Sequence, residues 1–208
     1  MMRGGLVLAA LLLSACAGGE GAPGGGGLLS FLSPASRAPQ DSISVYGGSV
    51  TVRGPNGYCV DPAASRATSG FAVMASCART ANADRQPRLD ALITAQVGRA
   101  GSAMVTGSEP ALSALLAGPT GRDMLSDGQP VAVSGVDQTP GVVFVNFTET
   151  ESTAPVAPPL MRAFFDIGDR LVTVSIRPVE GSDLDVTSER LLIAETIAAF
   201  RSVNAGDV

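Results

Sequence analysis

Beyond about residue 45, short stretches of the chain alternate between apolar and polar positions, which is the period of a half-buried β-strand. The clearest stretch is 89–98, where Ala91, Ile93, Ala95 and Val97 share one face. Turn residues separate the stretches, and Gly168-Asp169 is typical of a tight hairpin. We therefore predict strands over 49–54, 58–61, 70–78, 89–98, 130–138, 141–149, 160–167 and 170–178.

Two segments follow the helical period instead. Over 108–117, Ser108 can cap the start, Pro110 is tolerated in the first turn, and leucines follow at helical spacing. A short further turn is predicted over 121–126. The clearest helix is 187–203, capped by Thr187 or Ser188, and its predicted buried stripe consists of Leu192, Ile193, Ile197 and Phe200.

The C-terminal helix is expected to belong to the core. A helix of this length is marginal alone in water, so packing must supply its order. The alternative is a free amphipathic segment that docks on a partner or a membrane. The segment has two acids, Glu189 and Glu195, and two arginines, Arg190 and Arg201, so its charges balance. It therefore lacks the basic face that anionic lipid attracts.

The order of the elements predicts the fold class. Strands come first, then a helix, then more strands and a terminal helix. This order indicates an α+β domain, in which helices pack on an antiparallel sheet. We expect one globular domain over 45–204, which is long enough to bury a core of its own.

The first fifteen residues have the features of a secretory signal. A single charge, Arg3, precedes the apolar run 6–13, which is too short to cross a bilayer as a helix. The run ends in Leu13-Ser14-Ala15-Cys16, which resembles the lipobox of bacterial lipoproteins. The resemblance implies cleavage after Ala15 and lipid modification of Cys16. The alternatives are an ordinary signal peptide with a chance cysteine, or a buried helix.

Residues 16–44 are predicted to form a flexible tether between the lipid and the domain, since they are rich in glycine and then contain prolines. The tether contains an apolar patch, 28–32, for which two roles are open: docking on the domain or entry into the lipid surface. Ala17 follows the cysteine where aspartate retains enteric lipoproteins at the inner membrane. The resemblance therefore implies a palmitate-bearing lipoprotein of the outer membrane that faces the periplasm.

The composition excludes several kinds of chemistry. Histidine is absent, which rules out a Ser-His-Asp triad and a zinc site with histidine ligands. Every basic residue is arginine, so a Ser-Lys dyad and a Schiff base on lysine are excluded too. The net charge is −5 and no stretch is basic, so nucleic acid is not an expected partner. No cofactor is expected.

The two remaining cysteines, Cys59 and Cys77, are expected to pair. Thiols left over in an oxidising periplasm usually form a disulfide, and neighbouring strands would bring these two together. The alternative is a nucleophilic thiolate, but the chain has no histidine to activate one and no CxxC motif.

Five aspartates near predicted strand ends are candidates for acid–base chemistry: Asp61, Asp84, Asp90, Asp166 and Asp169. Turns favour aspartate for local hydrogen bonding, so the simpler interpretation is a set of turn residues. A second acidic group, Asp183, Asp185 and Glu189, could hold a calcium ion. Its spacing does not match an EF-hand, however, and acids are expected near a helix start in any case.

The succession of elements over about 45–204 resembles the PsbP-like fold, in which an early strand pair leads into the sheet. The ending Ile197-Ala-Ala-Phe200-Arg-Ser-Val203 is similar to the final helix of that fold. Photosystem assembly proteins, the Ran-binding Mog protein and many bacterial lipoproteins share it. The segments 57–61 and 75–77 also resemble an uncharacterised family of alphaproteobacterial secreted proteins.

These observations lead to one expected function and two alternatives. We expect a membrane-anchored envelope lipoprotein without catalytic activity that binds a protein partner or aids assembly, as most PsbP-like proteins act as accessory factors. The first alternative is a periplasmic module that binds a small ligand or a metal. The second is an enzyme that uses only carboxylates, serine or tyrosine.

Overall fold

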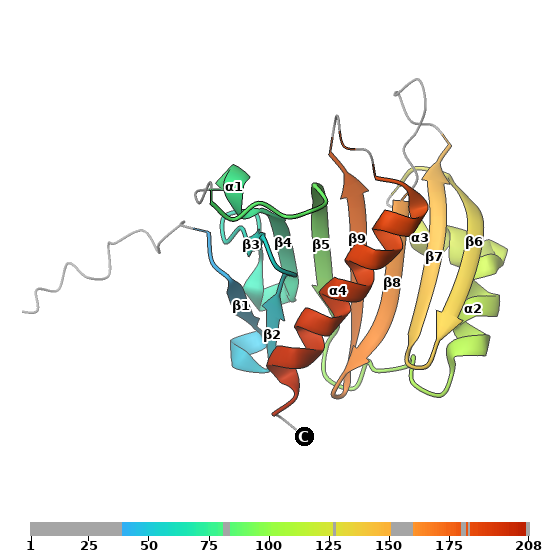
Figure 1. The fold of residues 1–208 in the computed structure, drawn as a ribbon. Helices are drawn as coiled ribbons and strands as arrows, with labels where there is room; N and C mark the ends of the chain where they lie inside the picture. The colour runs from blue at the N-terminus through green and yellow to red at the C-terminus, as the bar shows by residue number, and fades with distance from the viewer. Residues whose placement is uncertain are drawn as a thin grey trace, which may run out of the picture. The chain divides into compact units, whose positions relative to one another are not determined.

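The computed structural model describes residues 39–80, 84–126, 128–150, 160–179, 182 and 184–206. Its centre is a sheet of seven antiparallel strands in the order β3-β4-β5-β9-β8-β7-β6 (Figure 1). The strands are β3 (Tyr58–Val60), β4 (Phe71–Ser76), β5 (Ala91–Val97), β6 (Val131–Thr139), β7 (Val142–Glu149), β8 (Leu160–Ile167) and β9 (Arg170–Pro178). Each corresponds to a predicted strand, although 70–78 and 89–98 were predicted longer at both ends.

A separate two-stranded hairpin precedes the sheet. Its strands are β1 (Ser42–Val45) and β2 (Val50–Arg53), and only β2 was predicted. Val45 is fully buried, and Gln40 forms a β-bridge with Val60 of the main sheet. The predicted boundary between tether and domain at residue 45 is therefore too late. The reason is that β1 is four residues long and adjoins Gly47-Gly48, so its alternation was too brief to recognise.

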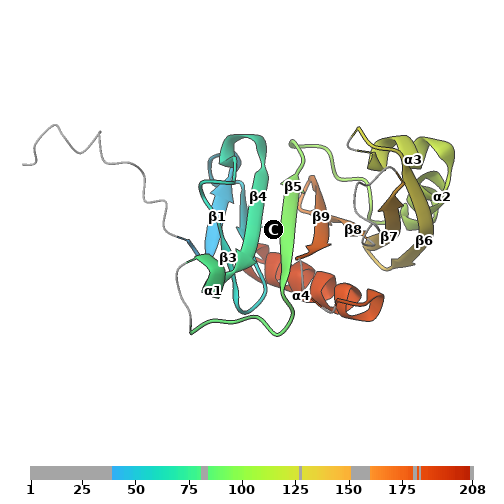
Figure 2. The ribbon, with the colours of Figure 1, turned by 90° about the horizontal axis from the view of Figure 1, so that it is seen from above.

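Helices lie on both faces of the main sheet (Figure 2). The long helix α4 (Val186–Asn204) covers one face together with the β1–β2 hairpin. Two short helices, α2 (Glu109–Ala117) and α3 (Pro119–Leu125), pack on β6 and β7 at the other face. A single helical turn, α1 (Cys77–Thr80), follows β4 directly. This arrangement confirms the predicted α+β class.

The C-terminal helix is part of the core, as predicted. All four residues of its expected stripe are buried: Leu192, Ile193, Ile197 and Phe200. The Phe200 ring meets Phe165 of β8 edge to face, with ring centroids 5.8 Å apart. At the helix end, Asn204 accepts a hydrogen bond from the Thr51 N–H and donates one to the Thr51 carbonyl.

The predicted cap of α4 was wrong by a few residues. Asp185, not Thr187 or Ser188, is the capping residue, and its carboxylate accepts a hydrogen bond of 2.7 Å from the Ser188 N–H. The same bond holds the pKa of the Asp185 carboxyl below its usual range. Asp and Ser are equally preferred at the cap position and Thr is only somewhat less so, which is why residue type alone did not distinguish Asp185 from the two predicted caps.

The helix pair α2–α3 builds a second, smaller core. Leu112, Leu116 and Leu125 are buried there against residues of β7 and β8. Gly121 makes the close approach of α3 to α2 possible, because a Cβ at this position would lie 2.3 Å from the Leu116 Cα. The described residues include no helix long and apolar enough to cross a membrane.

Candidate functional site

The predicted lipid site and its surroundings lie outside the described residues. These are Cys16, the signal 1–15, most of the predicted tether, and the patch 28–32. Lipid modification, cleavage and location in the envelope therefore stay predictions.

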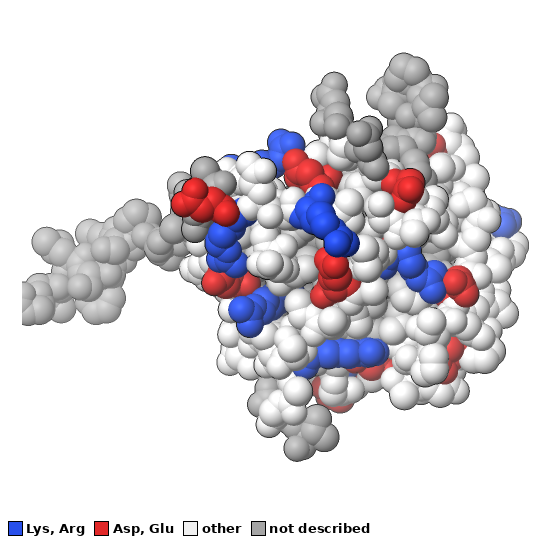
Figure 3. All heavy atoms as spheres, viewed as in Figure 1, with Lys and Arg blue, Asp and Glu red and all other residues white. Residues whose placement is uncertain are grey.

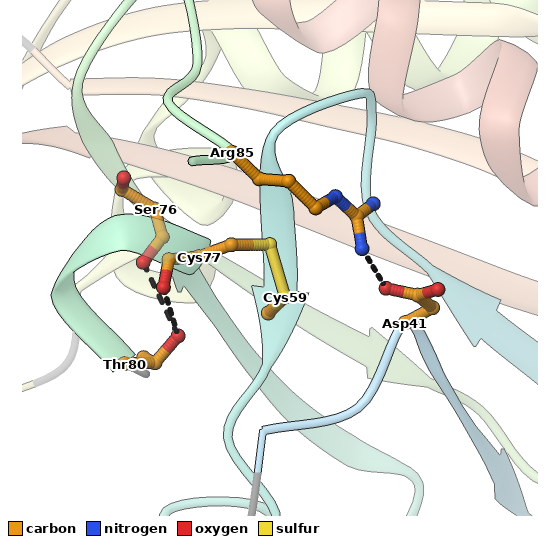
Figure 4. Close-up of a disulfide and its surroundings, with 6 residues drawn as sticks. All are labelled: Asp41, Cys59, Ser76, Cys77, Thr80 and Arg85. Atoms are coloured by element: carbon orange, nitrogen blue, oxygen red, sulfur yellow. Dashed lines mark hydrogen bonds and ion pairs between the residues drawn. A yellow bond between two sulfur atoms is a disulfide. The ribbon is translucent and has the colours of Figure 1, made fainter. Parts of the chain in front are cut away.

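Cys59 and Cys77 are joined by a disulfide (Figure 4). Their Cα atoms are 4.9 Å apart, and both residues are buried. The bond does not join neighbouring strands as expected: Cys59 lies in β3, whereas Cys77 is the first residue of α1. The Cys77 N–H donates to the Gly57 carbonyl at 2.8 Å, so a backbone bond fixes the same corner. Neither sulfur is present here as a thiolate nucleophile.

An ion pair lies next to this corner. Arg85, in the loop that follows α1, contacts Asp41 just before β1 (Figure 4). Both side chains are well exposed, so the pair adds little stability. It links the beginning of the folded region to the loop between α1 and β5.

Two of the candidate aspartates hold a loop. Asp166 accepts three backbone hydrogen bonds of 2.8–3.0 Å, from the N–H groups of Met104, Val105 and Thr106. Asp169 accepts one from the Gly101 N–H at 3.0 Å. These two carboxylates therefore fasten the β5–α2 connection to the β8–β9 hairpin.

The other three candidate aspartates also lack a shared site. Asp61 accepts hydrogen bonds from the N–H groups of Ala63 and Ala64, which is the local turn bonding expected of aspartate. Asp90 is paired with Arg79 through two hydrogen bonds of 2.6 and 2.9 Å. Asp84 is exposed in the loop before β5. The five acids are thus distributed over separate local contacts.

The calcium hypothesis gains no support from the described residues. Asp183 lies outside them. Asp185 is engaged as the cap of α4, and Glu189, in the first turn of that helix, is buried. Within the described part of the chain, no group of three or more His, Cys, Asp or Glu could hold a metal ion.

A groove lies on the face of the sheet that α2 and α3 cover only in part. Its floor is a polar row across three strands, because Thr94 of β5 pairs with Ser175 of β9, and Ser175 pairs with Arg162 of β8. We call this hollow of about 280 Å³ the sheet groove. It is lined by Phe71, Leu92, Thr94, Leu125, Gln129, Val131, Phe147, Glu149, Leu160, Arg162, Ser175, Ile176 and Arg177.

Apolar side chains stand on both sides of the polar row. Leu125 at the end of α3 and Phe147 of β7 line one side of the groove, and both also belong to the smaller core beneath α2 and α3. Phe71 of β4 and Leu92 of β5 line the opposite side and are only partly buried. The sheet groove therefore combines an apolar body with a few polar groups, the composition typical of a binding site.

Arg162 is held in place at the centre of the groove. Its Nε donates to the Ser175 hydroxyl at 2.8 Å, and its guanidinium lies over the Phe147 ring, 5.3 Å from the ring centroid. Arg177 and Glu149 form an ion pair of 3.0 Å among the lining residues. Hydrogen bonding, cation–π contact and ion pairing thus pre-organise the charged groups of the groove.

The opposite face, which bears α4, has a different character. Arginines and acids lie side by side there, without a continuous patch of one sign (Figure 3). Arg190 and Asp137 form one such pair at 2.8 Å, and Arg88 lies 3.9 Å from Glu195. This face therefore does not offer the basic stripe that nucleic acid needs.

The sheet groove is not among the sites predicted from the sequence. The predicted apolar face of 89–98 consists of Ala91, Ile93, Ala95 and Val97, and Leu92 and Thr94 alternate with these residues in the chain. The missing information was which part of that face α2 and α3 leave open. The one available signal was the mixture of Leu92 and Phe71 with polar residues at outward positions of β5 and β4.

Solved structures that this chain is distantly similar to include two of Mog1 proteins. The Ran-binding protein Mog1p of Saccharomyces cerevisiae is 14% identical, with a TM-score of 0.47 over 82% of this chain and 98% of that chain. A point mutant of protein Mog1 is 12% identical, with a TM-score of 0.45 over 77% and 92% of the two chains. Likenesses at this level support no statement about family or partner.

No protein-family model matches the chain, and no curated protein is similar enough to be called a relative.

Proposed function

We propose that this protein is a non-catalytic lipoprotein of the bacterial cell envelope that binds a partner protein through the sheet groove. The observation that carries the proposal is the groove itself, a partly apolar hollow beside a fixed arginine on an incompletely covered sheet face. The sequence contains no histidine or lysine, and the candidate acids Asp166, Asp61 and Asp90 are engaged in hydrogen bonds or an ion pair that hold the fold. Both observations favour binding over catalysis.

The lining of the groove suits an extended segment of a protein. Half-buried Phe71 and Leu92 offer contacts for apolar side chains. Thr94, Ser175 and Gln129 offer hydroxyl and amide groups for a peptide backbone, whose N–H and C=O groups need partners when they leave water. A purely aliphatic ligand would leave these polar groups without water or a partner, which is unfavourable.

The second candidate function is the binding of a small molecule in the same groove. Its volume, about 280 Å³, lies just below the usual range of about 300–1,000 Å³ for ligand pockets, so only a compact molecule would fit. The two functions differ in what a photoreactive side chain at the groove would capture.

Cross-linking in the native envelope tests the proposal. A photoreactive residue in place of Arg177, whose side chain is 52% exposed at the groove, should capture a reproducible protein partner. The matched control replaces Arg99, an exposed arginine just beyond the far end of β5, and should capture much less. Equal capture at both positions contradicts a role of the groove. No captured protein, combined with a thermal shift produced by a metabolite, supports the small-ligand function instead.

A separate prediction concerns the anchor. Because Leu13-Ser14-Ala15-Cys16 resembles a lipobox, radioactive palmitate should label the wild-type protein, and the protein should fractionate with membranes. Two or more acyl chains are needed for such a stable hold. The Cys16→Ser variant should lose both properties. Label and membrane association that persist in this variant would show that Cys16 is not the anchor.

A further inference from the structure

Glu189 is a buried carboxyl group in the first turn of α4. Its residue is 0% exposed, and both carboxyl oxygens lack a hydrogen-bond partner among the described residues. Buried polar groups in proteins are almost always hydrogen-bonded, so an unpartnered carboxyl group calls for an explanation. The groove proposed above plays no part in it, since Glu189 lies on the opposite face of the sheet.

Within the described part of the chain, no positive charge compensates this carboxyl group. The neighbouring Arg190 is directed elsewhere, because its guanidinium pairs with Asp137 at 2.8 Å and lies 3.6 Å from the Phe144 ring centroid. The charge that acts on Glu189 is the carboxylate of Asp185, one turn earlier in the chain. This negative charge disfavours ionisation of Glu189. Burial, reinforced by Asp185, raises the pKa of Glu189 to about 7.

The strands beneath α4 supply no charge either. The positions of β8 and β9 in the core below the helix are all apolar: Met161, Ala163, Phe165, Val172, Val174 and Ile176. The charged residues Arg162 and Arg177 of these strands line the sheet groove on the other face. Arg170 donates to the Gly98 carbonyl and lies over the Tyr46 ring, and Asp166 is bonded to the 104–106 backbone. On β2, which α4 also contacts, the charged residue is the exposed Arg53. None of these groups perturbs the pKa of Glu189.

We propose that Glu189 is a proton-controlled latch of the N-terminal turns of α4. With a neutral carboxyl group, these turns pack on the sheet as observed. An ionised carboxylate reaches water only if these turns open, because the described residues around it in the packed state offer neither a cation nor a hydrogen-bond donor. Opening would also weaken the Arg190–Asp137 link between α4 and the edge strand β6.

The direction of the pH dependence follows from the two protonation states. In the open state the carboxyl group returns towards its ordinary pKa of 4.5, whereas in the closed state its pKa is about 7. Between these values the closed state binds more protons, so closure weakens as the pH rises from about 4.5 to about 7. Above pH 7 the carboxyl group is ionised in both states and the dependence levels off. Each unit of pKa difference changes the opening equilibrium about tenfold.

Hydrogen exchange of the full chain in detergent tests the latch. After correction for intrinsic rates, the amides of residues 190–193 should lose roughly tenfold or more of their protection between pH 5 and pH 8. Glu189→Gln should keep the same protection at both pH values. Glu195→Gln, an exposed glutamate on the same helix, should behave like the wild type. Equal losses in the wild type and in Glu189→Gln, or no loss in either, would overturn the proposal.

A second measurement does not depend on a substituted protein that folds. The ¹³C signal of the Glu189 side-chain carboxyl group should titrate with a midpoint near pH 7 in the wild type. A midpoint close to 4.5 would show that the carboxyl group reaches water in the folded state, and the latch would be refuted.

Discussion

Phe200→Ala is expected to lower the free energy of unfolding by about 3–5 kcal/mol. Phe200 is fully buried at the junction of α4 and the sheet, and its ring packs edge to face on Phe165. Truncation removes the buried apolar area and leaves a cavity that the β8 and β9 side chains cannot fill without repacking. Urea denaturation monitored by circular dichroism measures the change.

Leu191→Ala is the matched control for this prediction. Leu191 lies on the same helix but is 42% exposed, so its truncation should change the free energy of unfolding by well under half as much. Similar small changes for both variants would mean that α4 is not part of the core. The predicted loss is a large share of the 5–15 kcal/mol that typically separates folded from unfolded domains, so Phe200→Ala should be near its stability limit.

Loss of the Cys59–Cys77 disulfide is expected to cost about 3 kcal/mol. The bond closes a loop between residues 18 apart, and in the chain-entropy model it stabilises by restricting the unfolded chain. The double variant Cys59→Ala/Cys77→Ala should therefore unfold at a lower urea concentration. The β3 edge and the α1 corner should open first, since the bond joins them.

Reduction supplies the control for the disulfide. Dithiothreitol should destabilise the wild type by a similar amount and leave the double variant unchanged. Intact-mass analysis of protein taken from the envelope should show no thiol that reacts with an alkylating agent at Cys59 or Cys77 before reduction. Two reactive thiols at these positions would contradict the bond in the native protein.

The sheet could be predicted from the sequence because its strands differ in their two faces. The alternation in 89–98 and 170–178 marks residues that the structure buries against α4, such as Ile93 and Val174. The four residues of β1 and the single turn α1 gave no such signal, since neither is long enough for a period to show. The cap of α4 was predicted at Thr187 or Ser188 because both are good capping residues, and the preference for Asp185 in the structure does not follow from residue type alone.

The candidate site was predictable only in part. The pairing of Cys59 with Cys77 follows from redox reasoning, and the simpler interpretation of the aspartates as turn residues holds for Asp61. Asp166 accepts hydrogen bonds from three N–H groups of a loop about sixty residues earlier in the chain. These are tertiary contacts, which no local sequence pattern predicts. The same is true of Glu189, whose place at a helix start predicts an exposed acid, whereas the structure buries it.

A groove-filling substitution tests whether the sheet groove binds the partner. Thr94→Trp places an indole over the polar row of the floor, while Ser44→Trp adds the same side chain at an exposed position of β1. Each variant also carries the photoreactive residue in place of Arg177, and the measurement is the yield of partner protein that it cross-links in the native envelope. Equal protein levels and equal melting temperatures of the variants are confirmed first. We expect at least a tenfold loss for Thr94→Trp and a wild-type yield for Ser44→Trp. A wild-type yield for Thr94→Trp would contradict binding of the partner in the sheet groove.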